Sequence, residues 1–448
     1  MKGVFSPLDE ELALPAGQLS SFVLEAVVRL ATWMPFGRAV AEVAWFTGVR
    51  VSETTVRRLT EGAGATYAAE QTAETTVLER ETPPAPAGPA VQALSVDGAM
   101  VPLVGGVWGE VKTLALGTVT PRPAGCRRRP QQAVEITDLS YFSRMTDHET
   151  FTRLALVETH RRGTETAGTV CAVCDGATWI PGFVDHHRPD AVRILDWPHA
   201  VGYVAAVAAA VYGPATSAAS AWLSHQKATL LHGDPATLLA DLAQLHATVA
   251  AVATGQQERW AWTVAPPRPT DPPLRGVLGQ EAAQQAVPAV AQSLEYLRTR
   301  EAQIQYAAFR AAQYPLGSGS VESANKLLVE SRLKGAGMRW APAHVNPMVA
   351  LRTVTAGDRW AEAWPLIRCA QRRERQARAS QRRTARQAAR TRRAAEQAAA
   401  AADAITPVPR PLAPPLRPPT PAPAHSRSST PAPDHPWRHA SLSHRRSA

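Results

Sequence analysis

Three carboxylate residues in this chain have neighbours that suit a metal-dependent site. Asp97 and Asp175 each end a short β-prone run and each precede Gly-Ala. Glu322 lies just after a Gly-Ser-Gly turn, in the first turn of an expected amphipathic helix. We predict that the two strands end at the carboxyl edge of one sheet, where α/β proteins place their sites, and that the helix packs on that sheet. Such a set of oxygen ligands suits Mg²⁺ or Mn²⁺.

The chemistry expected of such a site is phosphoryl transfer. Two ions about 4 Å apart stabilise the attacking and the leaving oxygen of an in-line displacement at phosphorus. The chain contains no GxxxxGK[ST] motif, so nucleotide hydrolysis is not indicated. Each residue alone has a simpler interpretation, because a strand-ending Asp-Gly is most often a turn and an acidic residue favours a helix N-terminus. The combination of the three favours the metal site.

The residues around the two aspartates predict an α/β fold with a mixed sheet. Expected strands lie at residues 91–97, 107–118, 134–142, 169–175 and 191–195, and an amphipathic helix lies at residues 148–162. The order β-β-β-α-β-α-β implies an antiparallel first half, and the last two strands have the apolar character of buried parallel strands. Cys171 and Cys174 form a CxxC pair without a second pair, so we interpret them as core residues.

The N-terminal part predicts a small helical domain that binds DNA. Residues 20–62 read as three helices, the third over residues 53–61 with Ser52 as its N-cap. A helix, a Gly-containing turn and a helix form the helix-turn-helix pattern, in which Arg57 and Arg58 would contact DNA. A small helical domain without DNA contact would give the same pattern. The Pro-rich residues 66–90 are expected to form a linker.

The rest of the chain divides into a helical part and a basic tail. Residues 198–255 and 279–313 are expected to be helical, with a loop at residues 266–273. Residues 369–404 form an Arg-rich, helix-prone segment, and the Pro/Ser/Arg-rich residues 405–448 are expected to be disordered. Residues 371–448 hold 16 Arg and 4 acidic residues, a charge of +12, which leaves −2 of the total +10 for residues 1–370. The tail therefore suits a polyanion.

Composition also bears on location. No apolar run reaches the roughly 20 residues of a membrane span, and the N-terminus lacks the features of a signal peptide. We expect a cytoplasmic, nucleoid-associated protein with no membrane partner.

Six segments carry a resemblance to a known family. They are Val96-Asp97-Gly-Ala-Met-Val-Pro102, Trp108-Gly-Glu-Val-Lys112, Cys174-Asp-Gly-Ala-Thr-Trp-Ile180, Asp190-Ala-Val-Arg-Ile-Leu-Asp-Trp-Pro-His199, Gly317-Ser-Gly-Ser-Val-Glu-Ser-Ala-Asn-Lys326 and Arg332-Leu-Lys-Gly-Ala-Gly-Met-Arg-Trp340. In this order they resemble insertion-sequence transposases of the ISKra type, a group related to the mutator-like DDE transposases. The resemblance covers roughly residues 5–368.

The resemblance implies an RNase H-like core interrupted by an all-helical insertion. It assigns the catalytic metal ligands to Asp97, Asp175 and Glu322, with two Mg²⁺ or Mn²⁺ ions as cofactors. Asp196-Trp-Pro-His199 matches a C/D-x-x-H signature, which gives Asp196 and His199 an auxiliary role in positioning DNA or supporting the metal site; a core histidine at a helix start is the simpler interpretation of His199.

The resemblance, together with the composition of the linker and of the C-terminal segments outside it, gives the expected domains. They are a helix-turn-helix-like domain at 1–65, the linker at 66–90, the first part of the core at 91–200, the helical insertion at 201–313, core helices with the catalytic Glu at 314–368, the Arg-rich helix at 369–404 and the tail at 405–448.

The implied activity is DNA transposition. The enzyme would cleave transposon ends and join the freed 3′-OH to target DNA, acting as a homo-oligomer on DNA. Four basic residues after Glu322 are predicted to contact phosphates, although a solvated basic face would look the same: Lys326, Arg332, Lys334 and Arg339. The alternative is a catalytically silent DNA-binding or regulatory protein derived from a transposase.

Overall fold

The computed structural model describes residues 19–122, 134–266 and 271–403. The described residues divide into two units, one up to residue 377 and one from residue 378 onward. Helix α15 (Trp360–Asp403) belongs to both and includes the predicted Arg-rich helix, which begins earlier than residue 369. The predicted disordered tail lies outside the described residues.

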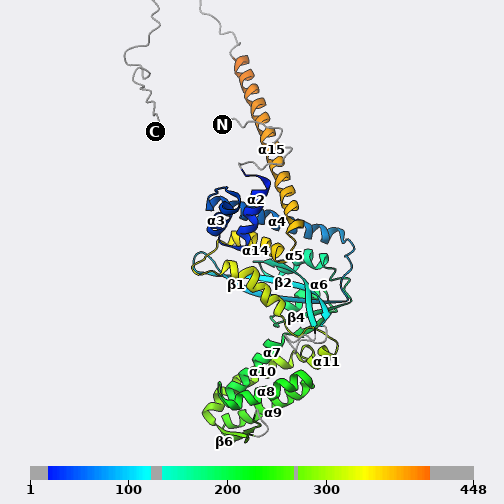
Figure 1. Ribbon diagram of the computed structural model, residues 1–448, viewed down its shortest axis with the longest axis vertical. Coiled ribbons are helices and arrows are strands. Elements are labelled where there is room, and N and C mark those ends of the chain that lie inside the picture. The colour runs from blue at the N-terminus through cyan, green and yellow to red at the C-terminus, as the bar shows by residue number, and fades with distance from the viewer. Residues whose placement is uncertain (1–18, 123–133, 267–270, 404–448) are drawn as a thin grey trace, which may run out of the picture. The chain divides into compact units, whose positions relative to one another are not determined.

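A five-stranded mixed sheet lies at the centre of the first unit (Figure 1). Its strands are β1 (Val91–Pro102), β2 (Trp108–Pro121), β3 (Val134–Arg144), β4 (Thr169–Cys174) and β5 (Val192–Leu195). The spatial order is β3-β2-β1-β4-β5. The pairs among β1, β2 and β3 are antiparallel, and β4 pairs in parallel with both β1 and β5. The predicted mixed α/β sheet with an antiparallel first half is confirmed.

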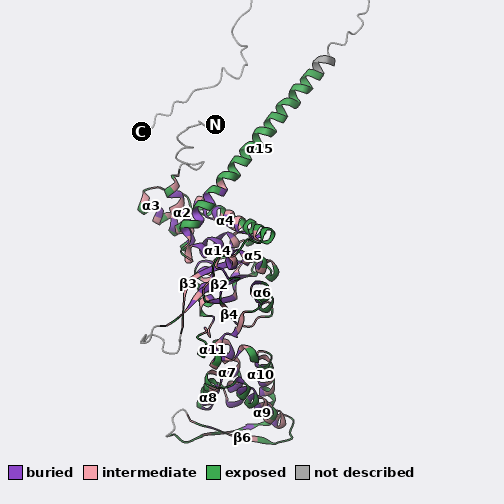
Figure 2. Ribbon diagram, turned by 90° about the vertical axis from the view of Figure 1, so that its right-hand side faces the viewer, coloured by how far each residue is buried: buried purple, intermediate pink, exposed green. Residues whose placement is uncertain are grey.

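Alternating side chains give the sheet two buried faces. Even-numbered residues of β1 and β2, such as Leu94 and Leu114, pack with α5 (His148–Arg161) and α6 (Ile180–His187). Odd-numbered residues, such as Val101 and Val111, pack with α12 (Gly319–Ala324) and α14 (Pro342–Ala356). The strands are therefore mostly buried, as Figure 2 shows. The helix that contains Glu322 covers the odd-numbered face.

Three helices precede the sheet: α2 (Ser21–Trp33), α3 (Phe36–Thr47) and α4 (Glu53–Glu81). The turn between α3 and α4 starts at Gly48 in a left-handed conformation, and Ser52 caps α4 as predicted by accepting the Thr55 amide.

The predicted linker at residues 66–90 is wrong over its first part, because α4 continues to Glu81. No Pro or Gly interrupts residues 65–82, and a buried stripe at three- or four-residue spacing packs the helix against the body of the protein. The stripe consists of Val56, Thr60, Ala63, Tyr67, Gln71 and Thr75. At Gly64 the backbone approaches α14 so closely that a Cβ would lie 2.1 Å from the Pro347 carbonyl oxygen.

The segment between β5 and α12 forms its own layer of helices. They are α7 (Trp197–Tyr212), α8 (Ser217–His232), α9 (Pro235–Ala253), α10 (Gln280–Arg298) and α11 (Tyr306–Ala311). Their core is continuous with Cys171, Val173 and Ile194 of the sheet. In the described part of the chain α9 alone is long and apolar enough to span a membrane, and its leucines are buried in this core.

The insertion is not all-helical, contrary to the prediction. An antiparallel hairpin, β6 (Arg259–Val264) and β7 (Leu274–Gly279), lies between α9 and α10. Residues 259–264 alternate in exposure, and Trp262 packs edge-on against Tyr212 at 5.1 Å between ring centroids. The aromatic residues of this short alternating run were the signal for a strand.

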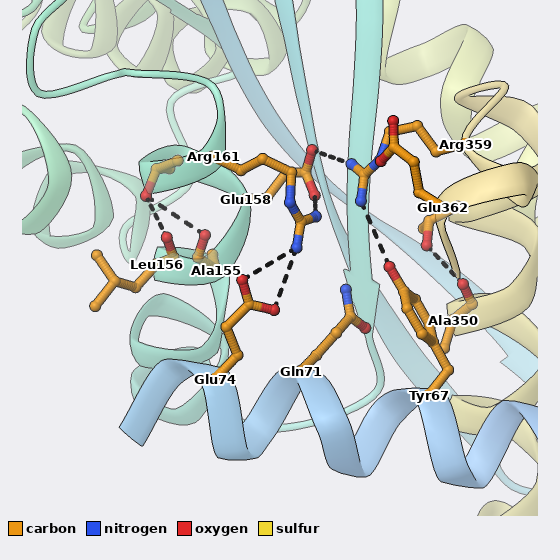
Figure 3. A network of polar contacts seen from close by, with 12 residues as sticks. Tyr67, Gln71, Glu74, Ala155, Leu156, Glu158, Arg161, Ala350, Arg359 and Glu362 are labelled. Carbon is orange, nitrogen blue, oxygen red and sulfur yellow. Dashed lines mark hydrogen bonds and ion pairs between the residues drawn. The ribbon is translucent and has the colours of Figure 1, made fainter. Parts of the chain in front are cut away.

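A buried carboxylate ties α5 to two other parts of the first unit (Figure 3). Glu158 accepts hydrogen bonds from Arg161 at 3.0 Å and from Arg359, just before α15, at 2.6 Å. Its side chain is 1% exposed. Arg161 also reaches Glu74 of α4 at 3.2 Å. The charges of Arg161 and Arg359 are thus compensated by one carboxylate that is itself shielded from water.

We expect Glu158→Gln to destabilise the fold by about 3–5 kcal/mol, because it leaves two partly buried guanidinium groups without their shared carboxylate. Glu74→Gln, which removes a more exposed partner of Arg161, should cost less than about 1 kcal/mol. Urea denaturation of both variants measures the difference. Equal losses would contradict the role assigned to burial.

His187 is a second buried polar group, between α6 and α5. Its ring lies against Phe183, with centroids 4.6 Å apart, and its nitrogens contact the Thr159 hydroxyl at 3.2 Å and the Thr152 carbonyl at 3.0 Å. Burial lowers the pKa of His187 to about 3. The folded protein therefore holds this imidazole neutral.

Unfolding releases His187 to its ordinary pKa of about 6.5, so the unfolded chain binds an extra proton between roughly pH 3 and 6.5. We expect stability to fall as the pH falls through this window. His187→Gln should reduce the slope by up to about 1.4 kcal/mol per pH unit. Urea midpoints at pH 5, 6 and 7.5 test this, with His225→Gln, at an exposed histidine outside the contacts of His187, as the control that keeps the slope.

Candidate active site

Strand register brings three aspartates to one edge of the sheet. The pairing of β1 with β4 ends at Leu94 opposite Ala172, and three residues further along each strand stand Asp97 and Asp175. The pairing of β4 with β5 ends at Cys174 opposite Leu195, and the next residues are Asp175 and Asp196. Neighbouring strands lie about 4.8 Å apart. The three aspartates therefore follow one row across β1, β4 and β5.

Asp97 does not end its strand, contrary to the prediction. β1 continues to Pro102, and Asp97 is paired with Thr113 of β2. Gly98 also lies within the strand, where a Cβ would come 2.3 Å from a Glu110 carboxylate oxygen. Glycine here makes room for a neighbouring side chain. Strand β1 stops pairing with β4 after Leu94, although its other edge stays paired with β2.

The face of the sheet decides what Asp97 contacts. As an odd-numbered residue of β1 it shares the face of Val101, which α12 and the residues after it cover. One carboxylate oxygen accepts the Gly98 amide at 2.7 Å, and the other accepts the side-chain amide of Asn325 at 2.8 Å. Asp97 is thereby fixed toward the helix that contains Glu322.

Asp175 begins the turn after β4, as predicted. Gly176 has a positive φ of 82°, which an L side chain rarely adopts. The Asp175 carboxylate accepts the Ala177 amide at 3.1 Å. The side chain is partly exposed.

Asp196 has both carboxylate oxygens engaged. One accepts the His199 amide at 3.0 Å and so caps α7, and the other accepts the Ser318 amide at 2.7 Å. The residue is 3% exposed. Asp196 thus links the point at which the chain leaves the sheet to the segment that returns from the insertion. Because backbone amides occupy both of its carboxylate oxygens, we interpret Asp196 as a positioning residue.

Glu322 lies in the first turn of α12 and is exposed. After it the helix widens into a π-helical turn, Asn325–Glu330. Arg352 of α14 donates to the carbonyls of Leu327 and Leu328, which the wider turn leaves accessible. Arg352 therefore stabilises the irregular segment that brings Asn325 to Asp97.

The three aspartates and Glu322 line one cleft of about 360 Å³. Its lining comprises Val96, Asp97, Asp175, Asp196, Pro198, His199, Ser318 and Glu322. Burial raises the pKa of Asp97 above its usual range, and the charges of Asp175 and Glu322 raise it further, while the Gly98 and Asn325 hydrogen bonds lower it. The cleft thus concentrates negative charge contributed by three separate segments.

The donor set of this cleft fits a hard divalent cation. Asp97, Asp175 and Glu322 offer carboxylate oxygens, and a cation would relieve the repulsion among them. Across residues 19–122, 134–266 and 271–403, however, no three His, Cys, Asp or Glu side chains form a ready set of metal ligands. The carboxylates share a cleft without being assembled around one point.

The predicted DNA-contacting residues have different surroundings. Arg57, Arg58, Lys326 and Arg339 are exposed, and Lys334 is half-buried in an ion pair with Glu330 at 2.8 Å.

Arg332 is buried, and its prediction as a DNA contact is wrong. It is 2% exposed, and its guanidinium lies 4.7 Å from the Phe36 ring centroid and 5.2 Å from that of Trp340. It donates to the Ala31 carbonyl at the C-terminal end of α2, where a cation is favourable. Arg332 holds the return segment against the N-terminal helices.

Sequence reasoning missed two residues at this site. Asn325 follows Glu322 by three positions, a spacing that brings residues to one helix face, so it could have been found. Tyr296 of α10 donates to the Asp175 carbonyl at 2.7 Å across 121 residues, and no local pattern reveals this contact. His199 is half-buried beside Tyr203 and Tyr296, at 5.5 and 5.8 Å between ring centroids.

CxxC proves to be a core feature, as predicted. Cys171 and Cys174 are buried, and burial raises the pKa of both thiols to about 12. Neither is a reactive thiolate.

No protein-family model matches this chain, and no curated protein matches it.

We expect Mn²⁺ to raise the melting temperature, because an ion that binds only the folded state stabilises it by mass action. A concentration 100 times the dissociation constant corresponds to about 2.7 kcal/mol. Asp97→Asn and Asp175→Asn should remove most of the rise in a thermal-shift titration. Asp185→Asn, at an exposed carboxylate outside the cleft, should retain it. A rise that survives in all three variants would place the cation elsewhere.

Proposed function

We propose that this chain is a DNA transposase of the DDE type, with an RNase H-like core. The single observation that carries the proposal is that Asp97, Asp175 and Glu322 line one cleft, although Glu322 follows Asp175 by 147 positions in the sequence. A cluster of like charges is costly to the fold, and such clusters are found preferentially at sites of binding or catalysis. The resemblance of the surrounding segments to ISKra-type transposases points to the same three residues.

The fold supports the same assignment. Three antiparallel strands precede two parallel ones, with α5 and α6 on one face, in the order expected for the core. The long segment between β5 and α12 corresponds to the insertion, which in this chain includes the β6–β7 hairpin. Helices α2 to α4 correspond to the helix-turn-helix-like domain.

The mechanism assigns each group a task. Asp97, Asp175 and Glu322 would hold two Mg²⁺ or Mn²⁺ ions, which when bound stabilise the charge that develops on the oxygens of an in-line displacement. Asn325 orients the Asp97 carboxylate by its 2.8 Å hydrogen bond. Lys326, exposed and four residues after Glu322, contacts a phosphate of the strand in the cleft. Water attacks the phosphodiester at the transposon end, which yields a 3′-OH and a 5′-phosphate. The 3′-OH then attacks a target phosphodiester, so that it becomes joined to the target 5′-phosphate while the target's own 3′-oxygen leaves.

Affinity for DNA comes from outside the cleft. Arg57 and Arg58 are exposed on α4 near its N-terminus, the part of a recognition helix that meets base edges and phosphates. α15 contains ten Arg between residues 372 and 393, all exposed, and Figure 2 shows this helix almost entirely in the colour of exposed residues. Such a helix adds binding that is independent of sequence and weakens with salt.

Cleavage of DNA duplexes that carry the inverted repeats flanking the coding sequence tests the proposal. We expect Mg²⁺-dependent nicking and strand joining by the wild type, and losses of about 10²- to 10³-fold in Asp97→Asn, Asp175→Asn and Glu322→Gln, as for removal of groups that stabilise a transition state. The matched control Asp185→Asn should act as the wild type. DNA binding, measured separately, should survive in all four variants.

The second candidate is a DNA-binding protein without catalysis. The observation that favours it is the lack of a ready ligand set around one point among the described residues. It predicts that the wild type binds the ends in gel-shift experiments but neither cuts nor joins them, and that the carboxylate variants behave alike. That result would exclude the transposase.

A further inference from the structure

The turn that begins with Asp175 is held from the insertion by α10 and the residues directly after it. Tyr296 Oη donates a 2.7 Å hydrogen bond to the Asp175 carbonyl oxygen. Arg300 Nη2 donates a 3.0 Å hydrogen bond to the next carbonyl, that of Gly176. Two successive backbone acceptors are therefore satisfied by side chains that lie one helical turn apart.

Gly176 leaves the space that these side chains occupy. A Cβ at this position would lie 2.5 Å from Tyr296 Oη and 2.9 Å from Arg300 Nε. The positive φ of 82° also disfavours any other residue. The turn and the two side chains fit together only with glycine at residue 176.

The two side chains are themselves held in place. The Arg300 guanidinium lies 3.8 Å from the centroid of the Tyr296 ring, and the Tyr203 ring of α7 stacks on Tyr296 at 3.9 Å and 12°. Ser293 of α10 donates to the Tyr203 carbonyl at 3.1 Å and fastens the two helices together. Burial raises the pKa of Tyr296 to about 12, so its hydroxyl stays protonated and donates at neutral pH.

We propose that Tyr296 and Arg300 are positioning residues that fix the Asp175 turn and so keep the Asp175 carboxylate in the cleft with Asp97. This rests on the proposed function of Asp175. Because Tyr296 and Arg300 belong to the insertion, the insertion contributes to the site although these residues lie far from Asp175 in the sequence. A contact made only for packing would not need hydrogen bonds to the successive carbonyls of Asp175 and Gly176.

Tyr296→Phe tests the proposal, because it removes the hydroxyl and keeps the ring stack. Arg300→Gln removes the second hydrogen bond and the cation above the ring. The matched control is Tyr203→Phe, which removes the hydroxyl from the other ring of the stack and leaves the bond to Asp175 in place. The full chain is measured in three ways: hydrogen exchange of peptides spanning residues 171–182, single-turnover cleavage with DNA affinity measured separately, and the Mn²⁺ concentration that gives half of the melting-temperature rise.

For Tyr296→Phe we expect exchange in the turn to become about tenfold faster, the upper range for loss of one hydrogen bond. The cleavage rate should fall about tenfold at unchanged DNA affinity, and about tenfold more Mn²⁺ should be needed. Arg300→Gln should change all three measurements in the same direction. Tyr203→Phe should leave all three near wild type.

Other outcomes separate this inference from the transposase proposal. If the wild type cleaves and Tyr296→Phe cleaves equally well at the same Mn²⁺ concentration, positioning is overturned and the transposase stands. If the wild type binds Mn²⁺ but does not cleave, the transposase falls, and faster exchange with weaker Mn²⁺ binding in Tyr296→Phe still supports positioning. If the wild type binds no Mn²⁺ or exchange in the turn is unchanged, positioning is wrong.

Discussion

The parallel register of β1, β4 and β5 is the constraint on which the rest of the site depends. Parallel strands present their carboxyl ends at one edge, so an aspartate at the same register on three neighbours must share that edge. Three carboxylates at strand spacing repel one another unless each is compensated. The structure compensates them differently: Asp196 uses both oxygens in backbone hydrogen bonds, Asp97 accepts from the Gly98 amide and from Asn325, and Asp175 accepts only the Ala177 amide.

Asp196 also explains how a long insertion leaves the site intact. The chain departs from the sheet at Asp196 and returns at Ser318, and one carboxylate oxygen binds the returning amide directly. Trp197 donates its amide to the Leu316 carbonyl at 2.9 Å beside it. Because the two ends of the insertion are fastened together, its length costs only the slowly growing entropy of loop closure. Glu322 can therefore stand four residues beyond the point of return.

Short-range sequence patterns predicted those parts of the fold that interactions between residues close in sequence determine. Alternation, glycine and helix-start signals predicted three features that the structure has. They are the order of strands and helices of the sheet along the chain, the turn at Gly176 and the position of Glu322 in its helix. The end of β1 was misplaced because Asp97-Gly98 has the sequence of a turn, whereas pairing with β2 carries the strand onward. Arg332 was misjudged because its aromatic neighbours and the α2 carbonyl come from residues 36, 340 and 31, which no sequence window contains together. The Tyr296 contact was beyond sequence reasoning for the same reason.

Buried arginines determine which parts of the site are free to adjust. Arg352 is 1% exposed, and it binds the Leu327 and Leu328 carbonyls of the π-helical turn together with the Thr32 carbonyl at the end of α2. Arg332 adds a second link to α2. These contacts anchor the segment that follows Glu322, and Asn325 and α10 hold Asp97 and the Asp175 turn. The exposed Glu322 side chain is therefore the carboxylate of the cleft that its surroundings restrain least.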